Sequence, residues 1–126
     1  MNDKWTTLGT ISHWYNSLLV YDDDVYGLES ECIYKLNLLA PENSLIEHKF
    51  VIPRQSYFDN FPAIVVDDKL FFAPHQVVYM YDFKTKEMKS LGIPNDPYYD
   101  SGYKLMFVKD NKLIVSMSEG IYSYPL

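Results

Sequence analysis

Aromatic and acidic side chains recur together along this chain, and they are the residues best suited to a binding chemistry. They occur in six short segments, of which three pair aromatic residues with Asn or Asp and three supply Glu or His. The segments are residues 12–17, 54–61, 95–103, 29–31, 74–76 and 118–119. Tyr and Trp are favoured anchors of protein interfaces, and carboxylates attract a basic surface. The candidate binding residues are Trp14, Tyr15, Glu29, Glu31, Tyr57, Phe58, Asp59, His75, Asp96, Tyr98, Tyr99, Asp100, Tyr103 and Glu119.

Catalytic and metal-binding chemistry have little support in the sequence. The histidines, His13, His48 and His75, are far apart, and no Cys-x-x-Cys or His-x-x-x-His pair indicates a zinc site. The chain also lacks the Gly-x-Ser-x-Gly motif of many hydrolases and a glycine cluster that could hold a phosphate. We therefore expect no enzymatic activity, no cofactor and no metal.

Three acidic runs, Asp22–Asp24, Asp67-Asp68 and Asp110-Asn111, could suggest calcium binding. The spacing of an EF-hand loop, with its glycine and distal glutamate, is absent from them. Asp and Asn favour tight turns through their own conformational preferences, so turn formation is the better interpretation.

The composition favours a folded, acidic protein. The net charge is −6, from 11 basic and 17 acidic residues, which disfavours nucleic acid and would steer a basic partner toward the chain. A length of 126 residues fits one domain. The lone cysteine, Cys32, excludes an internal disulfide and is expected to be a buried structural thiol. No segment resembles a signal peptide or reaches the roughly 20 apolar residues of a membrane span, so a cytoplasmic location is expected.

A threefold repeat must position the candidate residues. Residues 20–36, 65–81 and 108–124 align without a gap, as VYDDDVYGLESECIYKL, VVDDKLFFAPHQVVYMY and VKDNKLIVSMSEGIYSY. In each copy a valine leads to an Asp-rich turn, an apolar run, a polar turn and an Ile-Tyr or Val-Tyr pair. The copies are spaced by about 45 residues, within the period of about 40 to 50 residues that is typical of propeller blades.

Each repeat predicts short antiparallel strands joined by polar turns. The predicted strands are residues 17–21, 24–28, 32–37, 46–52, 63–66, 69–73, 77–83, 87–93, 105–109, 112–117 and 120–124. The third repeat lacks a fourth strand, and WTTLG (Trp5–Gly9) resembles MKSLG (Met88–Gly92), so the N-terminal segment is expected to complete it. The prediction is an all-β half-propeller of three four-stranded blades, at residues 13–53, 57–94 and 103–126 with 4–9, in a single domain over 1–126.

This architecture would gather the candidate residues on one face, because connectors between blades share a face with the turns between second and third strands. Three blades are fewer than the four or more of a closed propeller. The chain could be an open half-propeller, a homodimer closing a six-bladed ring, or a compact barrel-like stack. An open sheet edge favours aggregation, so an open form should be covered by a partner.

Two segments resemble known propeller repeats. VVYMYDFKTKEMKSLGIP (Val77–Pro94) is similar to the end of a kelch-type or WD-type repeat, where a strand ends in Tyr-Asp, a turn holds Thr and a last strand follows. DDKLFF (Asp67–Phe72) resembles the preceding kelch strand, although the glycine doublet, Trp-Asp and Gly-His signatures of these families are absent. The resemblance spans residues 5–124 and implies propeller-like repeats.

In size and overall character, as a motif-poor propeller, the whole chain also resembles a bacterial immunity protein of contact-dependent growth inhibition. That resemblance implies a non-catalytic inhibitor that covers the active site of a basic toxin domain, such as a nuclease, with its acidic, Tyr-rich face. One alternative is a carbohydrate-binding propeller with aromatic platforms in each blade. Another is a hydrolase or lyase that uses His75 and nearby acids.

Overall fold

The structure is a computed structural model of the chain, and the part that it describes is all-β. It describes residues 4–8, 15–29, 31–50, 61–74, 77–92, 94, 103–117 and 120–126, with the backbone alone for residues 103 and 104. Its strands form three antiparallel sheets of four, four and three strands, and these residues contain no closed barrel. The chain divides into two compact units, Met1–Val51 and Ile52–Leu126. The single domain predicted over the whole chain stays a prediction.

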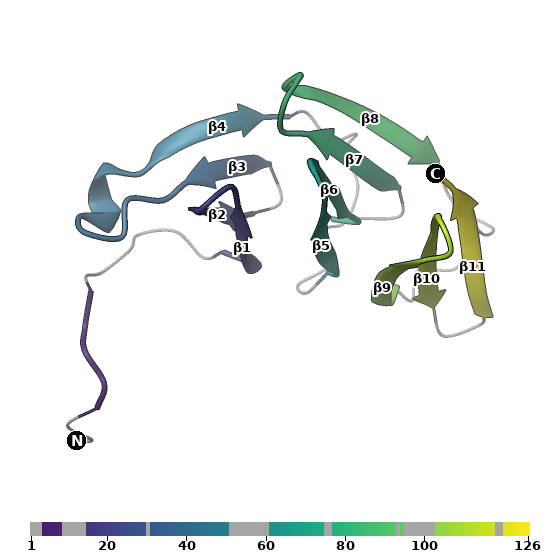
Figure 1. The fold of residues 1–126 in the computed structure, drawn as a ribbon, viewed down its shortest axis with the longest axis horizontal. Helices are drawn as coiled ribbons and strands as arrows, with labels where there is room; N and C mark the ends of the chain where they lie inside the picture. Colours follow the sequence, from purple (N-terminus) through teal and green to yellow (C-terminus); the bar gives the residue numbers. More distant parts are fainter. Residues whose placement is uncertain are drawn as a thin grey trace. The chain divides into compact units, whose positions relative to one another are not determined.

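The first unit holds one sheet whose strands lie side by side in chain order (Figure 1). The strands are β1 (Ser17–Tyr21), β2 (Asp24–Leu28), β3 (Cys32–Lys35) and β4 (Leu45–Lys49). A short 3-10 helix, η1 (Pro41–Asn43), interrupts the loop before β4. The Asn37 side chain accepts hydrogen bonds from the backbone N–H groups of Leu39 and Ala40, which shapes the start of that loop.

The second unit holds the other two sheets. One has the chain order β5 (Ala63–Val66), β6 (Lys69–Phe72), β7 (Val78–Asp82) and β8 (Glu87–Gly92). The other has the order β11-β10-β9, from β9 (Tyr103–Lys109), β10 (Lys112–Met117) and β11 (Gly120–Pro125). Figure 1 shows the two sheets next to each other, with β5 against β9.

An apolar cluster joins the two sheets of the second unit. Phe71 and Val78 from one sheet are buried together with Met106, Leu113 and Val115 from the other. Side chains alternate between the faces of a strand, so each sheet commits one face to this contact. Burial of apolar surface contributes about 25 cal/mol per Å², and this shared core explains why the two sheets form one unit.

The acidic runs form hairpin turns, as predicted. Asp22 and Asp23 lie between the paired residues of β1 and β2 and adopt φ values of 49° and 65°. Asp110 and Asn111 take the same place between β9 and β10, at 52° and 59°. Two successive left-handed residues define a type I′ turn, whose twist matches that of the flanking strands. The predicted turn at Asp67-Asp68 is also confirmed, with Asp67 alone left-handed.

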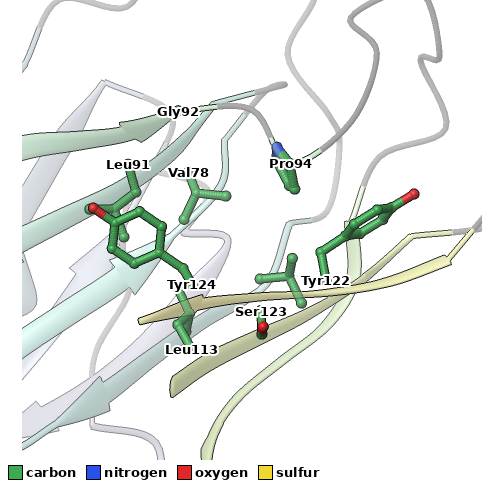
Figure 2. Close-up of a pocket in the computed structure, with 9 residues that line it drawn as sticks. Val78, Leu91, Gly92, Pro94, Leu113, Tyr122, Ser123 and Tyr124 are labelled. Carbon is green, nitrogen blue, oxygen red and sulfur yellow. The ribbon is translucent and has the colours of Figure 1, made fainter. Parts of the chain in front are cut away.

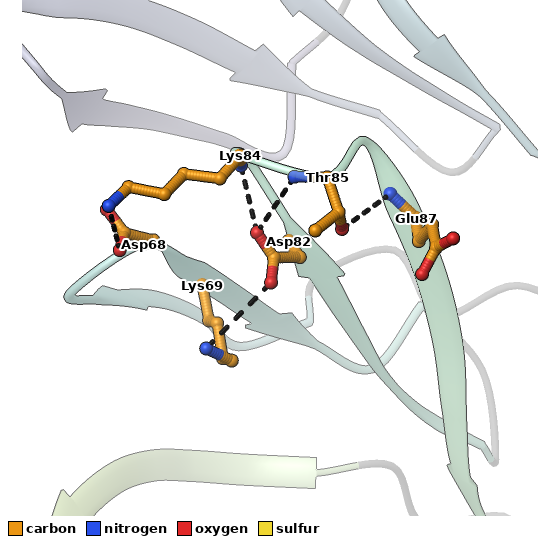
Figure 3. Close-up of polar contacts among 6 residues, drawn as sticks. All are labelled: Asp68, Lys69, Asp82, Lys84, Thr85 and Glu87. Carbon is orange, nitrogen blue, oxygen red and sulfur yellow. Dashed lines mark hydrogen bonds and ion pairs between the residues drawn. The ribbon is translucent and has the colours of Figure 1, made fainter.

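The hairpin between β7 and β8 is fixed by one carboxylate. Asp82 accepts hydrogen bonds at Oδ1 from the backbone N–H groups of Lys84, at 2.9 Å, and Thr85, at 3.2 Å (Figure 3). The Lys86 N–H donates to the Asp82 carbonyl oxygen at 2.8 Å, and Lys86 itself is left-handed with φ 64°. The second carboxylate oxygen lies 3.9 Å from Lys69 Nζ. The Thr85 hydroxyl also accepts a hydrogen bond from the Glu87 N–H at 3.4 Å, so the Asp and Thr of the repeat both have a local structural role.

The predicted strands are all present, with small shifts at their ends. The prediction of a strand over residues 4–9 that completes the third sheet differs from the structure. Lys4–Leu8 takes no strand conformation, and Trp5 and Leu8 are largely exposed. A strand needs a neighbour to satisfy its backbone hydrogen bonds, and the strand pairs of the described residues include none for this segment. Among the described residues, no helix is long and apolar enough to cross a membrane.

Candidate functional site

Three of the predicted binding residues are described with their side chains: Tyr15, Glu29 and Glu31. Tyr103 begins β9, and its backbone alone is described. The remaining predictions lie outside the described residues, namely Trp14, Tyr57, Phe58, Asp59, His75, Asp96, Tyr98, Tyr99, Asp100 and Glu119. The described part of the predicted face is therefore one end of the first sheet, which we call the Tyr15 corner: Tyr15, Glu29, Glu31, Cys32 and Tyr34.

Backbone hydrogen bonds hold the Tyr15 corner together. The Asn16 N–H donates to the Leu28 carbonyl at 2.6 Å, which extends the pairing of β1 with β2 toward Tyr15. In the turn between β2 and β3, the Glu29 N–H donates to the Cys32 carbonyl at 3.0 Å. The segment before β1 and this turn therefore lie at the same end of the sheet.

A glycine makes room for the aromatic ring of the corner. A Cβ atom added to Gly27 would lie 2.6 Å from Cδ1 of Tyr15, so the ring rests directly on the backbone of β2. The same ring meets Tyr34 edge-on, with centroids 5.6 Å apart and an angle of 66° between the planes. Tyr34 Oη donates a long hydrogen bond of 3.4 Å to Glu29 Oε1. Two phenol rings and one carboxylate are thus in direct contact.

Glu29 gives the corner a negative electrostatic character. Burial raises the pKa of Tyr34 to about 12, and the nearby Glu29 carboxylate adds to this rise. The pKa of Tyr15 is raised by the same two causes in the same order. Burial also raises the pKa of the Cys32 thiol, with a further rise from Glu29, while Lys49 acts in the opposite direction. Both phenols and the thiol therefore stay protonated at neutral pH.

These properties disfavour covalent chemistry at the corner. Cys32 is buried, as predicted, and its thiol is protonated, whereas the thiolate is the nucleophilic form of cysteine. On β4, His48 stacks near Phe50, and burial lowers the pKa of its imidazole, so it is neutral at pH 7. Among the residues described, no group of three or more His, Cys, Asp or Glu side chains could hold a metal ion. The corner is suited to hydrogen bonding, stacking and attraction of cations.

Tyr34 is a member of the corner that the sequence prediction did not single out. In the sequence, Tyr34 stands out only as the Tyr of the Ile-Tyr pair that ends the first repeat copy. A signal for the contact did exist in the repeat alignment. Gly27 aligns with Phe72 and Val115, so a glycine replaces a large side chain in the first copy alone. Such a gap indicates that another side chain fills the space, and Tyr15 fills it.

The second unit contains a small apolar cavity between β8 and β11. Its volume is about 150 Å³, and Figure 2 shows Tyr122 and Tyr124 from β11 opposite Leu91, Gly92 and Pro94. Val78, Leu113, Val115 and Ser123 complete the lining. Sites for small molecules usually measure about 300 to 1,000 Å³, so this cavity suits a single side chain. Its described lining does not include Tyr15, Glu29 or Glu31.

No protein-family model matches the chain, and no curated protein matches it in sequence. Two solved structures resemble it in fold. One is a chain from the complex of an S. cerevisiae Dbp5 variant with Nup159, a Gle1 variant, IP6 and ADP, with 14% identity, a TM-score of 0.52 and 87% of this chain covered. The other is the extracellular domain of the hybrid two component system BT4673 from B. thetaiotaomicron, with 14% identity, a TM-score of 0.58 and 98% covered. This chain spans 30% of the first matched chain and 16% of the second.

Proposed function

We propose that this chain is a non-catalytic protein-binding module that acts in the cytoplasm on a basic partner domain. In its most specific form, it is an immunity protein that neutralises a toxin domain, such as a nuclease, by covering the active site. The three sheets would be divergent kelch- or WD-type blades that present the binding face. The observation that supports the proposal is the Tyr15 corner, where the Tyr15 ring contacts Tyr34 and the Tyr34 hydroxyl donates to Glu29.

The corner offers complementary contacts to an arginine or lysine of such a partner. A guanidinium group can form charge-assisted hydrogen bonds with a carboxylate and stack on an aromatic face. Glu29 is half-buried beside the half-buried Tyr15 ring, and Glu31 is exposed on the same turn. The negative field at Tyr15, Cys32 and Tyr34 would draw a cationic group to this place.

The first test is whether a large toxin gene lies beside the gene of this chain; binding of the toxic domain that such a gene encodes is then measured by titration calorimetry and stopped-flow kinetics. Replacing Glu29 and Glu31 together by Gln is expected to slow association about tenfold and to reduce its dependence on salt, because rim charges act mainly on the association rate. The matched control is the double change of Asp22 and Asp23 to Asn, which removes the same charge from the turn between β1 and β2 and preserves the left-handed conformation.

Three outcomes would contradict this function. Equal slowing by both double variants would mean that only net charge matters and that the Tyr15 corner is not the contact. Binding to an array of glycans, with no binding to the toxin domain, would favour the carbohydrate-binding alternative. Turnover of a substrate that is lost on replacing His75 would favour the hydrolase or lyase alternative.

A further inference from the structure

Two sheets of the chain each carry an exposed apolar face. On the third sheet, Phe107 is 48% exposed and Ile121 75% exposed, and both lie on the face opposite the apolar cluster. On the first sheet, Leu18 is 63% exposed and Val20 64% exposed, and both belong to one face of β1. Contiguous exposed apolar side chains on a sheet face indicate an interaction site more strongly than scattered ones do.

The repeat shows which surface fits each of these faces. When the gapless alignment is continued two residues toward the N-terminus, Phe107, Ile114 and Ile121 of the third sheet are equivalent to three residues of the second sheet. Those equivalents are Ile64, Phe71 and Val78. All three pack against the third sheet inside the second unit. The exposed face of the third sheet is thus the counterpart of a face that already packs on another sheet.

The exposed face of the first sheet is equivalent, in the repeat, to the face of the third sheet that packs against the second sheet. Leu18 and Val20 are equivalent to Met106 and Val108 in the alignment. Met106 and Val108 are part of the apolar cluster and pack against the second sheet. In this contact β5 lies against β9. Within the second unit, the second and third sheets pack through one such pair of faces. The equivalent pair, on the third and first sheets, is exposed.

We propose that the exposed face of the third sheet binds the exposed face of the first sheet of a second copy of this chain. β9 of one copy would lie against β1 of the other, as β5 lies against β9 within the second unit. Each copy has both faces, so the contact can form twice around a two-fold axis. A single copy has too few sheets to cover its own faces, because closed arrangements of such sheets contain at least four.

The edge strand β11 gives an independent reason for a second copy. Among the described residues β11 pairs on one side only, with β10, and residues 5–8 belong to no strand. The sequence KWTTL (Lys4–Leu8) aligns with EMKSL (Glu87–Leu91), which lies in β8. β8 pairs with β7, and β11 is the strand of the third sheet that is equivalent to β7. The same register would place Trp5 opposite Tyr124 and Thr7 opposite Tyr122.

One partner copy can supply both the sheet face and the added strand. Six residues, 9–14, separate Lys4–Leu8 from Tyr15, and six residues can span at most about 20 Å. A copy that places its β1 against β9 thus keeps its N-terminal segment within reach of the neighbouring sheet. Backbone pairing at β11 and apolar packing at β9 would then stabilise the same dimer.

The test is the solution mass by light scattering, combined with site-specific cross-linking. We expect twice the mass of the chain, a single-chain mass for Phe107→Asp and for Val20→Asp, and no change for Leu39→Asp. Leu39 is 93% exposed in the loop before η1 and serves as the matched apolar control. Circular dichroism and thermal melting verify that each variant is folded, since all three changed side chains are exposed in the single chain.

Cross-linking identifies the pair of strands. Chains carrying Val20→Cys, mixed with chains carrying Phe107→Cys, should form a disulfide-linked heterodimer under mild oxidation. Neither chain mixed with wild type should do so, because Cys32 is buried. A wild-type mass of one chain at high concentration would overturn the proposal. So would a dimer whose mass survives both Asp substitutions, or a Val20→Cys, Phe107→Cys double variant that forms its disulfide only within one chain.

Discussion

The ring of Tyr15 lies so close to the backbone of Gly27 that a Cβ atom added there would be 2.6 Å from Cδ1 of the ring. The contact joins the segment before β1 to the middle of β2. It also places the ring against Tyr34, and through Tyr34 next to Glu29. The position of the candidate binding residues thus depends on a residue that has no side chain.

Replacing Gly27 by Ala is expected to displace the Tyr15 ring and to destabilise the first sheet by about 1–3 kcal/mol, because overpacked contacts force side chains and backbone to shift. Urea denaturation measures this change in the free energy of unfolding. The control is a double-mutant cycle with Tyr15→Ala, in which the penalty at Gly27 should largely disappear. An unchanged penalty in the Tyr15→Ala background would show that the contact is not its cause.

The raised pKa of Tyr34 makes the first sheet sensitive to alkaline pH. Its folded-state pKa of about 12 lies above the ordinary value of 10.0, so the folded chain holds the phenol proton more tightly than the unfolded chain. The resulting stability is fully present below pH 10 and is lost as the pH rises from 10 to 12. The loss is at most about 3 kcal/mol, and solvent screening reduces it.

Tyr34→Phe keeps the ring and should flatten this part of the stability profile, measured by denaturant unfolding at closely spaced pH values. The slope that remains would belong to Tyr15 and Cys32, whose pKa values are also raised by burial and Glu29. Tyr122→Phe, the same change on the third sheet, is the matched control. A profile that is equally steep in wild type and Tyr34→Phe would contradict the assignment.

Cys32 should react slowly with thiol reagents in the folded protein. Its side chain is buried, and its pKa is raised above the ordinary value of 9.0, first by burial and then by Glu29. Both effects lower the amount of accessible thiolate, which is the reactive form. Labelling with a chromogenic disulfide at pH 8 should be at least about a hundredfold slower than in urea. Equal rates in the two conditions would mean that β3 opens freely.

Lys86 occupies a position that favours glycine. Its φ of 64° places a long side chain in the left-handed region, which costs most residues about 1–2 kcal/mol. Lys86→Gly is therefore expected to stabilise the second unit by about 1 kcal/mol in thermal or urea unfolding. Lys84→Gly, two residues earlier in the same turn, is the control and should be neutral or destabilising. A loss of stability in Lys86→Gly would show that the left-handed conformation carries no strain here.

The strands and their turns could be predicted from the sequence because both have local causes. The Asp-rich pairs favour left-handed turns, and apolar alternation beside them limits where a strand can begin and end. β1, β2, β5, β6 and β10 begin at the predicted residues for this reason. β4 was predicted to continue to residue 52, but it ends at Lys49, although the Phe50 N–H still donates across to the Glu31 carbonyl at 2.9 Å.

Contacts between elements could not be predicted in the same way. Ile121 and Val78 occupy the same position in the repeat, yet Ile121 is exposed and Val78 is buried. The difference lies in the neighbours of their sheets, which a local pattern does not contain. Tyr34 was likewise missed, because its partners are Tyr15, nineteen positions earlier in the chain, and the side chain of Glu29.

The turn between β1 and β2 makes a practical attachment point for a reporter. Asp22 and Asp23 are exposed, and the strands that they join end at Tyr21 and Asp24, away from the Tyr15 corner. Exposed loop tips tolerate insertions better than other positions. A biotin-acceptor peptide inserted there would anchor the chain to a sensor surface in one orientation, with Tyr15 and Glu29 directed toward the flowing solution.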